Sequence, residues 1–315
     1  MLARAIQRVY QVSGDRVWLA DVIPRAVQFF EWLAIHRGHA ASKLLRIYQP
    51  DESGLDMSPK YDRRLGIDDA SFDTVAARWY RVMGELVGAY GLQRRPGTDL
   101  DDHRRFIWYD VLVNSIYADG LHRLSQLVLE NGDGDGLAAA LQRRSHEVTS
   151  SLIRDCWDED FGVFWDRDGI GDHQVRVLTV SSLFPLILPE LPAGMVQRLV
   201  DEHLLNESEF WTPYPVPSVA VGEPSFDPDF VSRGIFRGSS WINLNWYLYW
   251  ALRTHGRSDI ARALACRTIT MIAKSDLREC YGPYSGEGHG ARQFGWSSLV
   301  VDLAHTEGLR ILPGN

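Results

Sequence analysis

The sequence has little cysteine, no excess of basic charge and no long apolar run, and each shortage excludes a class of protein. Its three cysteines are too few and too scattered for a disulfide framework or a zinc knuckle. A net charge of -8 without any run of Lys or Arg argues against nucleic-acid binding. No apolar run approaches the roughly 18 residues of a membrane span, and no charged-then-apolar leader opens the chain. We therefore expect a cytoplasmic protein in a reducing compartment, with no membrane contact and a small partner of little or no charge.

The composition is that of a folded protein with an unusual content of tryptophan. Hydrophobic residues make up 45% and charged residues 23% of the 315 positions, which is typical of a globular protein with a sizeable core. We expect one large domain covering residues 1–315. The 11 Trp side chains offer flat apolar faces with one N–H donor each. Such faces suit sugars, although a large helical core also uses Trp, so both roles stay open.

Apolar residues recur at helical spacing through most of the chain, and no segment shows a convincing strand alternation. The pattern predicts about nine long helices in antiparallel succession, with long loops gathered at one end of the fold. Pro24 is expected to kink the second helix or to start its second part. The expected helices cover residues 1–10, 17–34, 71–90, 103–129, 137–156, 179–188, 193–205, 258–274 and 297–305, with another that opens at Ser239 or Ser240 as its N-cap.

A carboxylate-rich turn between Glu52 and Asp62 separates two of these helices. Its Ser-Gly and Ser-Pro pairs break regular structure on both sides of Asp56, and Leu55 and Met57 flank this acid. Partial desolvation raises the pKa of a carboxyl group, as a general acid requires. The alternative is a surface loop whose Asp and Ser cap the next helix.

A second candidate acid, Glu279, lies in the glycine-containing stretch between Leu277 and Gly290. Glycoside hydrolysis needs two carboxyl groups on opposite faces of the sugar ring, and Asp56 and Glu279 offer such a pair. On sequence spacing alone four other acids compete with them: Glu52, Asp62, Asp158 and Glu287.

Two further loops carry groups that bind ligands in other proteins. Residues 157–168 combine four aromatic and five acidic residues, and Trp157 opens this sugar-compatible stretch. Asn131-Gly-Asp-Gly-Asp-Gly136 matches the front of a calcium loop, but Gln142 stands where that loop needs a bidentate Glu. A plain connection between helices is the alternative there.

The turn at residues 52–59, Glu-Ser-Gly-Leu-Asp-Met-Ser-Pro, resembles the general-acid motif of glycoside hydrolase family 63 and of the related family 37 trehalases. Later segments look like further motifs of this family, in the same order, and span nearly the whole chain. The resemblance is greatest to compact bacterial members that act on glucosylglycerate or mannosylglycerate. The matching segments are Phe226-Asp-Pro228, Arg237-Gly-x-x-Trp-Ile-Asn-x-Asn245, Arg278-Glu-x-Tyr281, Gly286-x-Gly-x-Gly290 and Phe294-x-Trp296.

The resemblance implies an (α/α)6 barrel of paired helices with its active site at the end where the loops gather. Asp56 would be the general acid and Glu279 the general base of an inverting mechanism, with the carboxyl groups about 6.5 to 9.5 Å apart. It implies no metal and no organic cofactor, and its substrate would be a small saccharide or glycoside. We expect the sugar site to include Arg237, Trp241, Asn245, Tyr281, Trp296 and Trp157, some of which could instead have scaffold roles.

The chain also departs from the family pattern. Met57 stands where a polar or aromatic residue is usual, and Cys280 is unexpected beside the base. The family's barrel has twelve helices, so the helix count predicts a barrel that is incomplete at its N-terminal end. The leading hypothesis is an inverting α-glycosidase for a small α-glucoside or α-mannoside. The alternatives are a truncated, inactive sugar-binding protein of the same fold and a lyase or epimerase on a related toroid.

Overall fold

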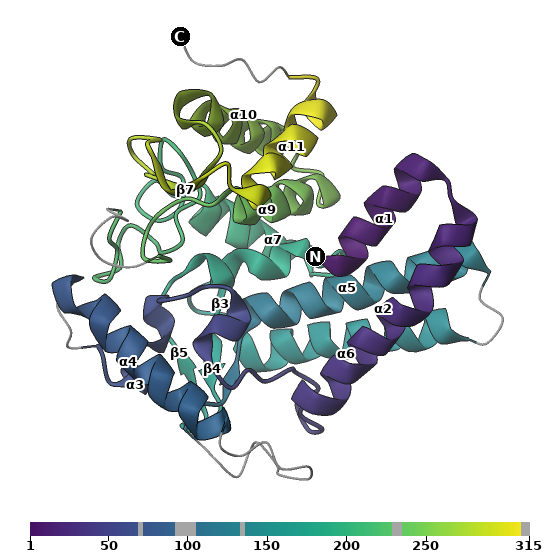
Figure 1. Ribbon diagram of the computed structural model, residues 1–315, viewed down its shortest axis with the longest axis horizontal. Coiled ribbons are helices and arrows are strands. Elements are labelled where there is room, and N and C mark those ends of the chain that lie inside the picture. The colour runs from purple at the N-terminus through teal and green to yellow at the C-terminus, as the bar shows by residue number, and fades with distance from the viewer. Residues whose placement is uncertain (69–71, 92–104, 133–135, 229–234, 310–315) are drawn as a thin grey trace.

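The computed structural model describes residues 1–68, 72–91, 105–132, 136–228 and 235–309, and it is predominantly helical. Successive long helices pack as pairs, α1 with α2, α5 with α6 and α9 with α10 (Figure 1). This arrangement confirms the all-helical prediction. The α-helices are α1 (Leu2–Ser13), α2 (Arg16–Arg37), α3 (Asp62–Leu65), α4 (Phe72–Gly91), α5 (Val111–Asn131), α6 (Leu137–Cys156), α7 (Ala193–Arg198), α9 (Ile242–Thr254), α10 (Ser258–Ser275) and α11 (Val300–Glu307).

Short strands and tighter helical turns connect these helices. The strands form one three-stranded sheet, in the order β1-β4-β5, and two hairpins, β2-β3 and β6-β7, all antiparallel. The strands are β1 (Trp108–Tyr109), β2 (Trp157–Asp158), β3 (Val163–Phe164), β4 (Asp166–Asp168), β5 (His173–Val175), β6 (Arg278–Tyr281) and β7 (Gly288–Arg292). The 3-10 turns are η1 (Pro50–Ser53), η2 (Pro59–Tyr61), η4 (Val180–Ile187) and η6 (Gly295–Leu299), and η5 (Leu199–Leu204) is a π-helical turn.

The first helix pair shows how local sequence sets helix ends. Gly14 closes α1 in the left-handed conformation, with φ of 63°, which costs glycine little. Asp15 then caps α2, because its side chain accepts the N–H of Trp18 at 2.9 Å. Pro24 lies inside α2, which continues through it to Arg37. Arg16–Arg37 is thus one helix, so Pro24 does not start a separate second one, and the kink expected there stays a prediction.

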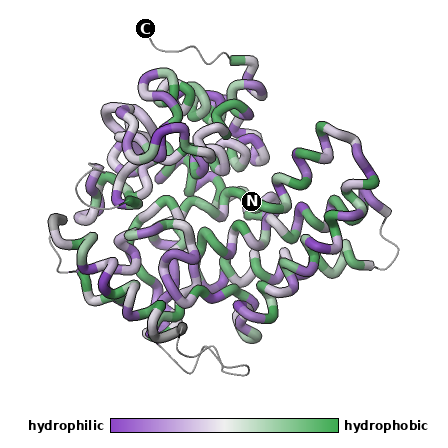
Figure 2. Tube along the Cα trace, in the orientation of Figure 1, coloured by the Kyte–Doolittle hydropathy of each residue, from purple (hydrophilic) through white to green (hydrophobic). Residues whose placement is uncertain are grey.

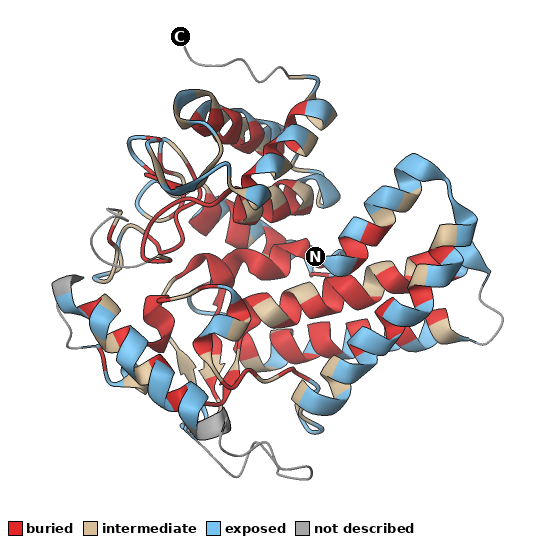
Figure 3. Cartoon of the chain, in the orientation of Figure 1, coloured by how far each residue is buried: buried red, intermediate tan, exposed pale blue. Residues whose placement is uncertain are grey.

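The core is concentrated in α5, α6, η4 and α9, which lie at the centre of the molecule (Figure 3). In α6 the buried residues lie mainly on one face, and hydrophobic and hydrophilic colours alternate along the tube in Figure 2, whereas η4 is buried along its whole length and α5 and α9 along most of theirs. In contrast, large apolar side chains remain exposed along the first helix pair. These are Met1, Leu2, Val9, Val12, Val17, Phe29, Trp32 and Ile35.

Three sequence predictions are corrected by the structure. The helix expected over 103–129 begins only at Val111, because Trp108 and Tyr109 form β1 against β4. The segment expected as a helix over 179–188 is the 3-10 turn η4, which contains Pro185. The helix expected to be capped by Ser239 or Ser240 has Trp241 as its N-cap, without a side-chain capping bond. In the described ranges, no helix combines the length and the apolarity that crossing a membrane requires.

Candidate active site

The acidic turn is largely buried, although Gly54 is exposed at the surface. Leu55, Met57 and Ser58 are buried on both sides of Asp56, which is itself half-buried. The hydroxyl of Ser53 donates to the carbonyl of Pro50 at 2.7 Å and accepts the N–H of Leu55 at 3.0 Å. Met57 adopts a left-handed conformation with φ of 61°, which is unusual for a residue with a long side chain. The backbone around Asp56 is thus folded into one specific turn.

The environment of Asp56 suits a group that holds a proton at mildly acidic pH. Burial, the charge of Asp51 and the charge of Glu279 together raise the pKa of Asp56 to about 6, while a bond to its own backbone N–H opposes the rise. Because Glu279 acts on the pKa of Asp56, the structure brings the two carboxyl groups into the same region. This region contains residues more than two hundred positions apart in the sequence.

Glu279 lies on β6, and the neighbouring strand β7 holds its side chain. Its Oε2 accepts the N–H of Ala291 at 2.9 Å. Gly290 lies so close that a Cβ added there would be 2.2 Å from the same oxygen. The indole N–H of Trp296 donates to the backbone carbonyl of Glu279 at 3.2 Å. The glycine-rich stretch therefore lets backbone approach the base itself.

The segment from Phe236 to Ser240 connects the acid turn to the base strand. The N–H of Phe236 donates to the carbonyl of Asp56 at 3.2 Å. Ser240 and Tyr281 form an isolated β-bridge with two backbone bonds, at 2.8 and 2.9 Å. The segment therefore also pairs with the last residue of β6. One continuous stretch of chain thus contacts both candidate catalytic elements.

Arg237 lies in this connecting segment, and its guanidinium is buried. It donates to both carboxylate oxygens of Asp62, at 2.9 and 2.6 Å. Such a bidentate pair fixes the relative orientation of its two partners. Arg237 therefore ties the end of the acid turn to the connecting segment.

Two of the three tryptophans expected at the sugar site, Trp241 and Trp296, meet beside this segment. The ring of Trp241 stacks on Phe236 with centroids 4.0 Å apart and meets the ring of Trp296 edge-on at 5.5 Å. Trp241 is fully buried and donates its indole N–H to the hydroxyl of Ser239 at 3.0 Å. Trp296 is only half-buried and lies next to the base strand.

Asn245 and Tyr281 are buried and hold the surrounding backbone. The Asn245 amide oxygen accepts the N–H of Val216 at 3.0 Å, and its nitrogen donates to the carbonyl of Pro215 at 2.6 Å. The Tyr281 hydroxyl donates to the carbonyl of Asp276 at 2.7 Å and accepts the N–H of Arg278 at 2.8 Å. Both side chains fix the chain that flanks the site.

Trp157 lies apart from this group. Its ring contacts Phe164 at 4.9 Å between centroids and the guanidinium of Arg198 at 5.9 Å, and its indole N–H donates to Glu159 at 2.6 Å. The aromatic, acid-rich stretch that it opens forms the hairpin β2-β3 and the strand β4. The structure does not join Trp157 to Asp56 or Glu279 through any contact in the described residues.

Two of the competing acids, Glu52 and Asp158, have structural contacts. Glu52 binds Arg37 at 2.9 Å and accepts the N–H of Tyr48 at 3.1 Å. Asp158 accepts the indole N–H of Trp165 at 3.1 Å and binds Arg176 at 2.9 Å. Their charges are therefore already compensated. Glu287 is exposed to solvent on the loop between β6 and β7.

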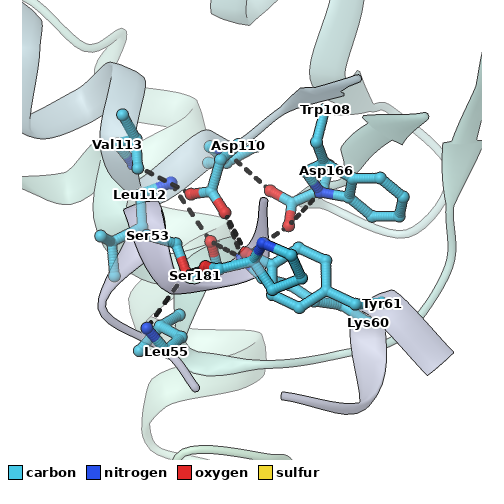
Figure 4. Close-up of polar contacts among 12 residues, drawn as sticks. Ser53, Leu55, Lys60, Tyr61, Trp108, Asp110, Leu112, Val113, Asp166 and Ser181 are labelled. Carbon is cyan, nitrogen blue, oxygen red and sulfur yellow. Dashed lines mark hydrogen bonds and ion pairs between the residues drawn. The ribbon is translucent and has the colours of Figure 1, made fainter. Parts of the chain in front are cut away.

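The sequence reasoning missed a buried polar cluster that the second half of the acid turn forms with other elements (Figure 4). Lys60 lies in it with its ammonium 2.7 Å from both Asp110 and Asp166. Asp110 could have been identified from sequence, because an Asp directly before an apolar run is typical of an N-cap, and it does cap α5. For Lys60 and Asp166 no comparable signal exists, since a charged residue is normally expected at the surface.

The described part of the chain contains no group of three His, Cys, Asp or Glu side chains arranged to hold a metal ion. The middle of the loop that resembles the front of a calcium site, residues 133–135, lies outside the described residues.

Comparison with known proteins finds relatives that align over nearly the whole chain. The chain is 24% identical over 333 residues to mannosylglycerate hydrolase from Thermus thermophilus, an alignment that covers 96% of this chain and 75% of that protein. It is 22% identical over 324 residues to glucosylglycerate hydrolase from Mycolicibacterium hassiacum, covering 95% of this chain and 69% of that protein.

Solved structures share the fold. A family 63 mannosylglycerate hydrolase from Thermus thermophilus, in complex with Tris and D-glycerate, superposes with a TM-score of 0.81 at 24% identity, covering 96% of this chain and 76% of that one. Neutral trehalase Nth1 from Saccharomyces cerevisiae superposes with a TM-score of 0.66 at 16% identity, covering 98% and 61%. These neighbours support the toroid of paired helices that the motifs imply.

The family assignment rests on a match that covers most of the chain. The model of the mannosylglycerate hydrolase MGH1-like glycoside hydrolase domain matches residues 1–297. The acid turn, the connecting segment and the base strand all lie within this match. The chain therefore belongs to this family of glycoside hydrolases, which resembles family 63 as the motifs predict.

Proposed function

We propose that the protein is an inverting α-glycoside hydrolase that acts on a small α-glucoside or α-mannoside of the glucosylglycerate or mannosylglycerate type. The observation that carries the proposal is the half-buried Asp56, whose pKa is raised to about 6 partly by Glu279. A carboxyl group that keeps its proton near neutral pH can act as a general acid. The names of the relatives and the D-glycerate bound to one of them support this class of substrate.

In the proposed reaction, Asp56 gives its proton to the glycosidic oxygen while the bond from that oxygen to the anomeric carbon breaks. Glu279 takes a proton from a water molecule on the opposite ring face, and the oxygen of that water bonds to the anomeric carbon. The products are the free aglycone and a sugar of inverted configuration. Exchange of one proton each with solvent returns Asp56 to its acid form and Glu279 to its carboxylate.

The surrounding residues divide into two proposed roles. Trp296 is half-buried beside the base strand, so its ring is placed to stack on the apolar face of a sugar. Arg237, Trp241, Asn245 and Tyr281 are buried and bound to protein groups, so we assign them to positioning the site. A sugar-binding role for Trp157 stays a proposal, although this residue lies apart from Asp56 and Glu279.

The test is hydrolysis of glucosylglycerate and mannosylglycerate, with the first anomer formed identified by proton NMR. Inversion of the anomeric configuration is expected, and retention would refute the mechanism. Asp56→Asn and Glu279→Gln should each lower kcat on the preferred substrate by roughly 10²- to 10⁴-fold. Full activity in either variant would remove that residue from the catalytic pair.

A second candidate function is an inactive sugar-binding protein of the same fold. The exposed apolar side chains of α1 and α2 favour it, because a barrel that is open on this side leaves such faces uncovered. Calorimetry of the wild-type protein with the same two glycosides distinguishes the candidates. Binding without any release of free sugar would support this second function.

A further inference from the structure

The ammonium of Lys60 lies at the centre of the buried cluster in Figure 4, and Lys60 belongs to the acid turn, four residues after Asp56. Its side chain is 2% exposed. It lies 2.7 Å from Asp110 Oδ2, 2.7 Å from Asp166 Oδ2 and 3.1 Å from the hydroxyl of Ser181. An ammonium has three N–H donors, so these three contacts use all of them.

The cluster contains two carboxylates but only one cation. Backbone N–H groups at the start of α5 compensate the second negative charge. Asp110 Oδ1 accepts the N–H of Val113 at 3.0 Å, and Asp166 Oδ1 accepts the N–H of Val111 at 2.6 Å. Both N–H groups belong to the first turn of α5, where the helix dipole favours negative charge. Burial alone would lower the pKa of Lys60, but Asp110 and Asp166 raise it above its ordinary value, so the side chain stays charged.

These contacts attach the acid turn to three separate elements. Asp110 caps α5, Asp166 belongs to β4 and Ser181 belongs to η4. The hydroxyl of Tyr61 adds a fourth bond, to Asp110 Oδ2 at 2.7 Å. A buried polar network whose members all find partners is rigid and specifies one arrangement.

The stretch between Lys60 and Asp56 transmits this anchoring along the backbone. Ser58 and Pro59 are buried, and the N–H of Ser58 donates to the carbonyl of Leu55 at 3.1 Å. Pro59 has a fixed φ, and Met57 is held in the left-handed region. The orientation of Asp56 therefore depends on where Lys60 is held.

We propose that Lys60, shared between Asp110 and Asp166, is a positioning residue that aims the Asp56 carboxyl at the glycosidic oxygen. The proposal rests on the proposed function, because it takes Asp56 as the general acid. It assigns the buried cluster a role in catalysis beyond holding the fold together.

The test compares two substrates that differ in their need for a proton. In hydrolysis of a glycerate glycoside, the glycerate would leave as a basic alkoxide unless its oxygen is protonated. The corresponding α-glycosyl fluoride instead releases the weakly basic fluoride ion. Loss of a positioned general acid should therefore affect the glycoside alone. Lys60→Met is expected to lower kcat/KM on the glycoside by about 10²-fold and on the fluoride by less than about 3-fold.

Arg4→Met is the matched control. Arg4 forms a comparably buried pair with Asp119, at 2.7 Å, in the interface of α1 with α5 and away from the acid turn. Its loss should change the rates on both substrates by the same factor. If Lys60→Met fails to fold, as judged by circular dichroism, Tyr61→Phe replaces it and is assessed by the same ratio, because it removes only the hydroxyl, with its bonds to Asp110 and Ser53.

The outcomes separate this inference from the function on which it rests. If Asp56→Asn lowers activity only on the glycoside while the Lys60 and Tyr61 variants lower both substrates equally, Lys60 has no positioning role. If Asp56→Asn itself lowers both equally, the assignment of Asp56 as the acid is wrong. If both Asp56→Asn and the Lys60 or Tyr61 variant lose activity on the glycoside but keep it on the fluoride, the proposal is supported.

Discussion

Asp56 lies on a turn whose neighbours are buried, whereas Glu279 lies on a hairpin whose second strand is largely exposed at Gly290, Ala291 and Arg292. The acid turn is anchored by side chains, through Lys60 and the charged groups around it. The base is anchored by backbone, through the close approach of β7.

The proposed chemistry explains this difference. A general acid must keep its proton, and removal from water favours the protonated carboxyl. A general base must be ionised and must meet a water molecule, so an exposed strand with one backbone donor suits it better. The contrast leads to four predictions, given from the largest expected effect to the smallest.

Glu279→Gln should lower kcat/KM by roughly 10²- to 10⁴-fold on the glycoside and by a similar factor on the glycosyl fluoride. Water must be activated whichever group leaves, so the loss should not depend on the leaving group. Stopped assays of both substrates measure it. Preserved fluoride hydrolysis in this variant would mean that Glu279 is not the base.

Arg237→Met should break the connection between the acid turn and the segment from Phe236 to Ser240, which pairs with the base strand. Removal of one partner from a buried ion pair typically costs about 3 to 5 kcal/mol of unfolding free energy, because Asp62 stays buried without its cation. Denaturant unfolding measures the loss. Arg25→Met is the control, since the pair of Arg25 with Asp21 is exposed and should contribute less than about 1 kcal/mol.

Gly290→Ala should displace the base, because the new Cβ would lie 2.2 Å from Glu279 Oε2. A misplacement of about 1 Å can cost about 10²-fold in rate, and we expect a loss of that order in kcat. Gly295→Ala is the matched control, because a Cβ there meets nothing within 4 Å. Equal activity of the two variants would show that the position of Glu279 does not depend on β7.

Activity should fall as the pH rises through about 6, where Asp56 loses its proton. Because the pKa of Asp56 is raised from 3.8 on folding, its protonation favours the folded state fully below pH 3.8, and this stabilisation is lost as the pH rises through 6. Asp56→Asn is neutral at every pH. It should raise the thermal midpoint at pH 8 by about 1 to 3 °C, but not at pH 4. The same increase at both pH values would contradict the raised pKa.

The sequence predicted the helices well and their short connections poorly. Helical periodicity over ten or more residues is a strong signal, and α6 and α10 match the expected ranges closely. In β1 only two residues pair with β4, which is too short for an alternation to be recognised. The π-helical turn η5 continues the apolar pattern of α7 without a break, so the sequence predicted a single helix over residues 193–205.

The residues of the candidate site that belong to a local sequence motif could be predicted. The residues that only the folded chain brings together could not. Asp56 and Glu279 were identified because their neighbours resemble those of a known family. The cluster around Lys60 joins residues 50 and 121 positions away along the chain, so no local pattern contains it. Sequence also could not show that Arg237 faces Asp62, since both residue types usually lie in water.

The bond from Ala291 makes the two oxygens of Glu279 unequal. Oε2 already accepts a backbone N–H, and Oε1 has no hydrogen-bond partner in the described part of the chain. In the proposed reaction the proton of the water would therefore be accepted at Oε1. The hairpin thereby restricts the direction from which water can approach the base, so β7 would help to select the ring face that is attacked.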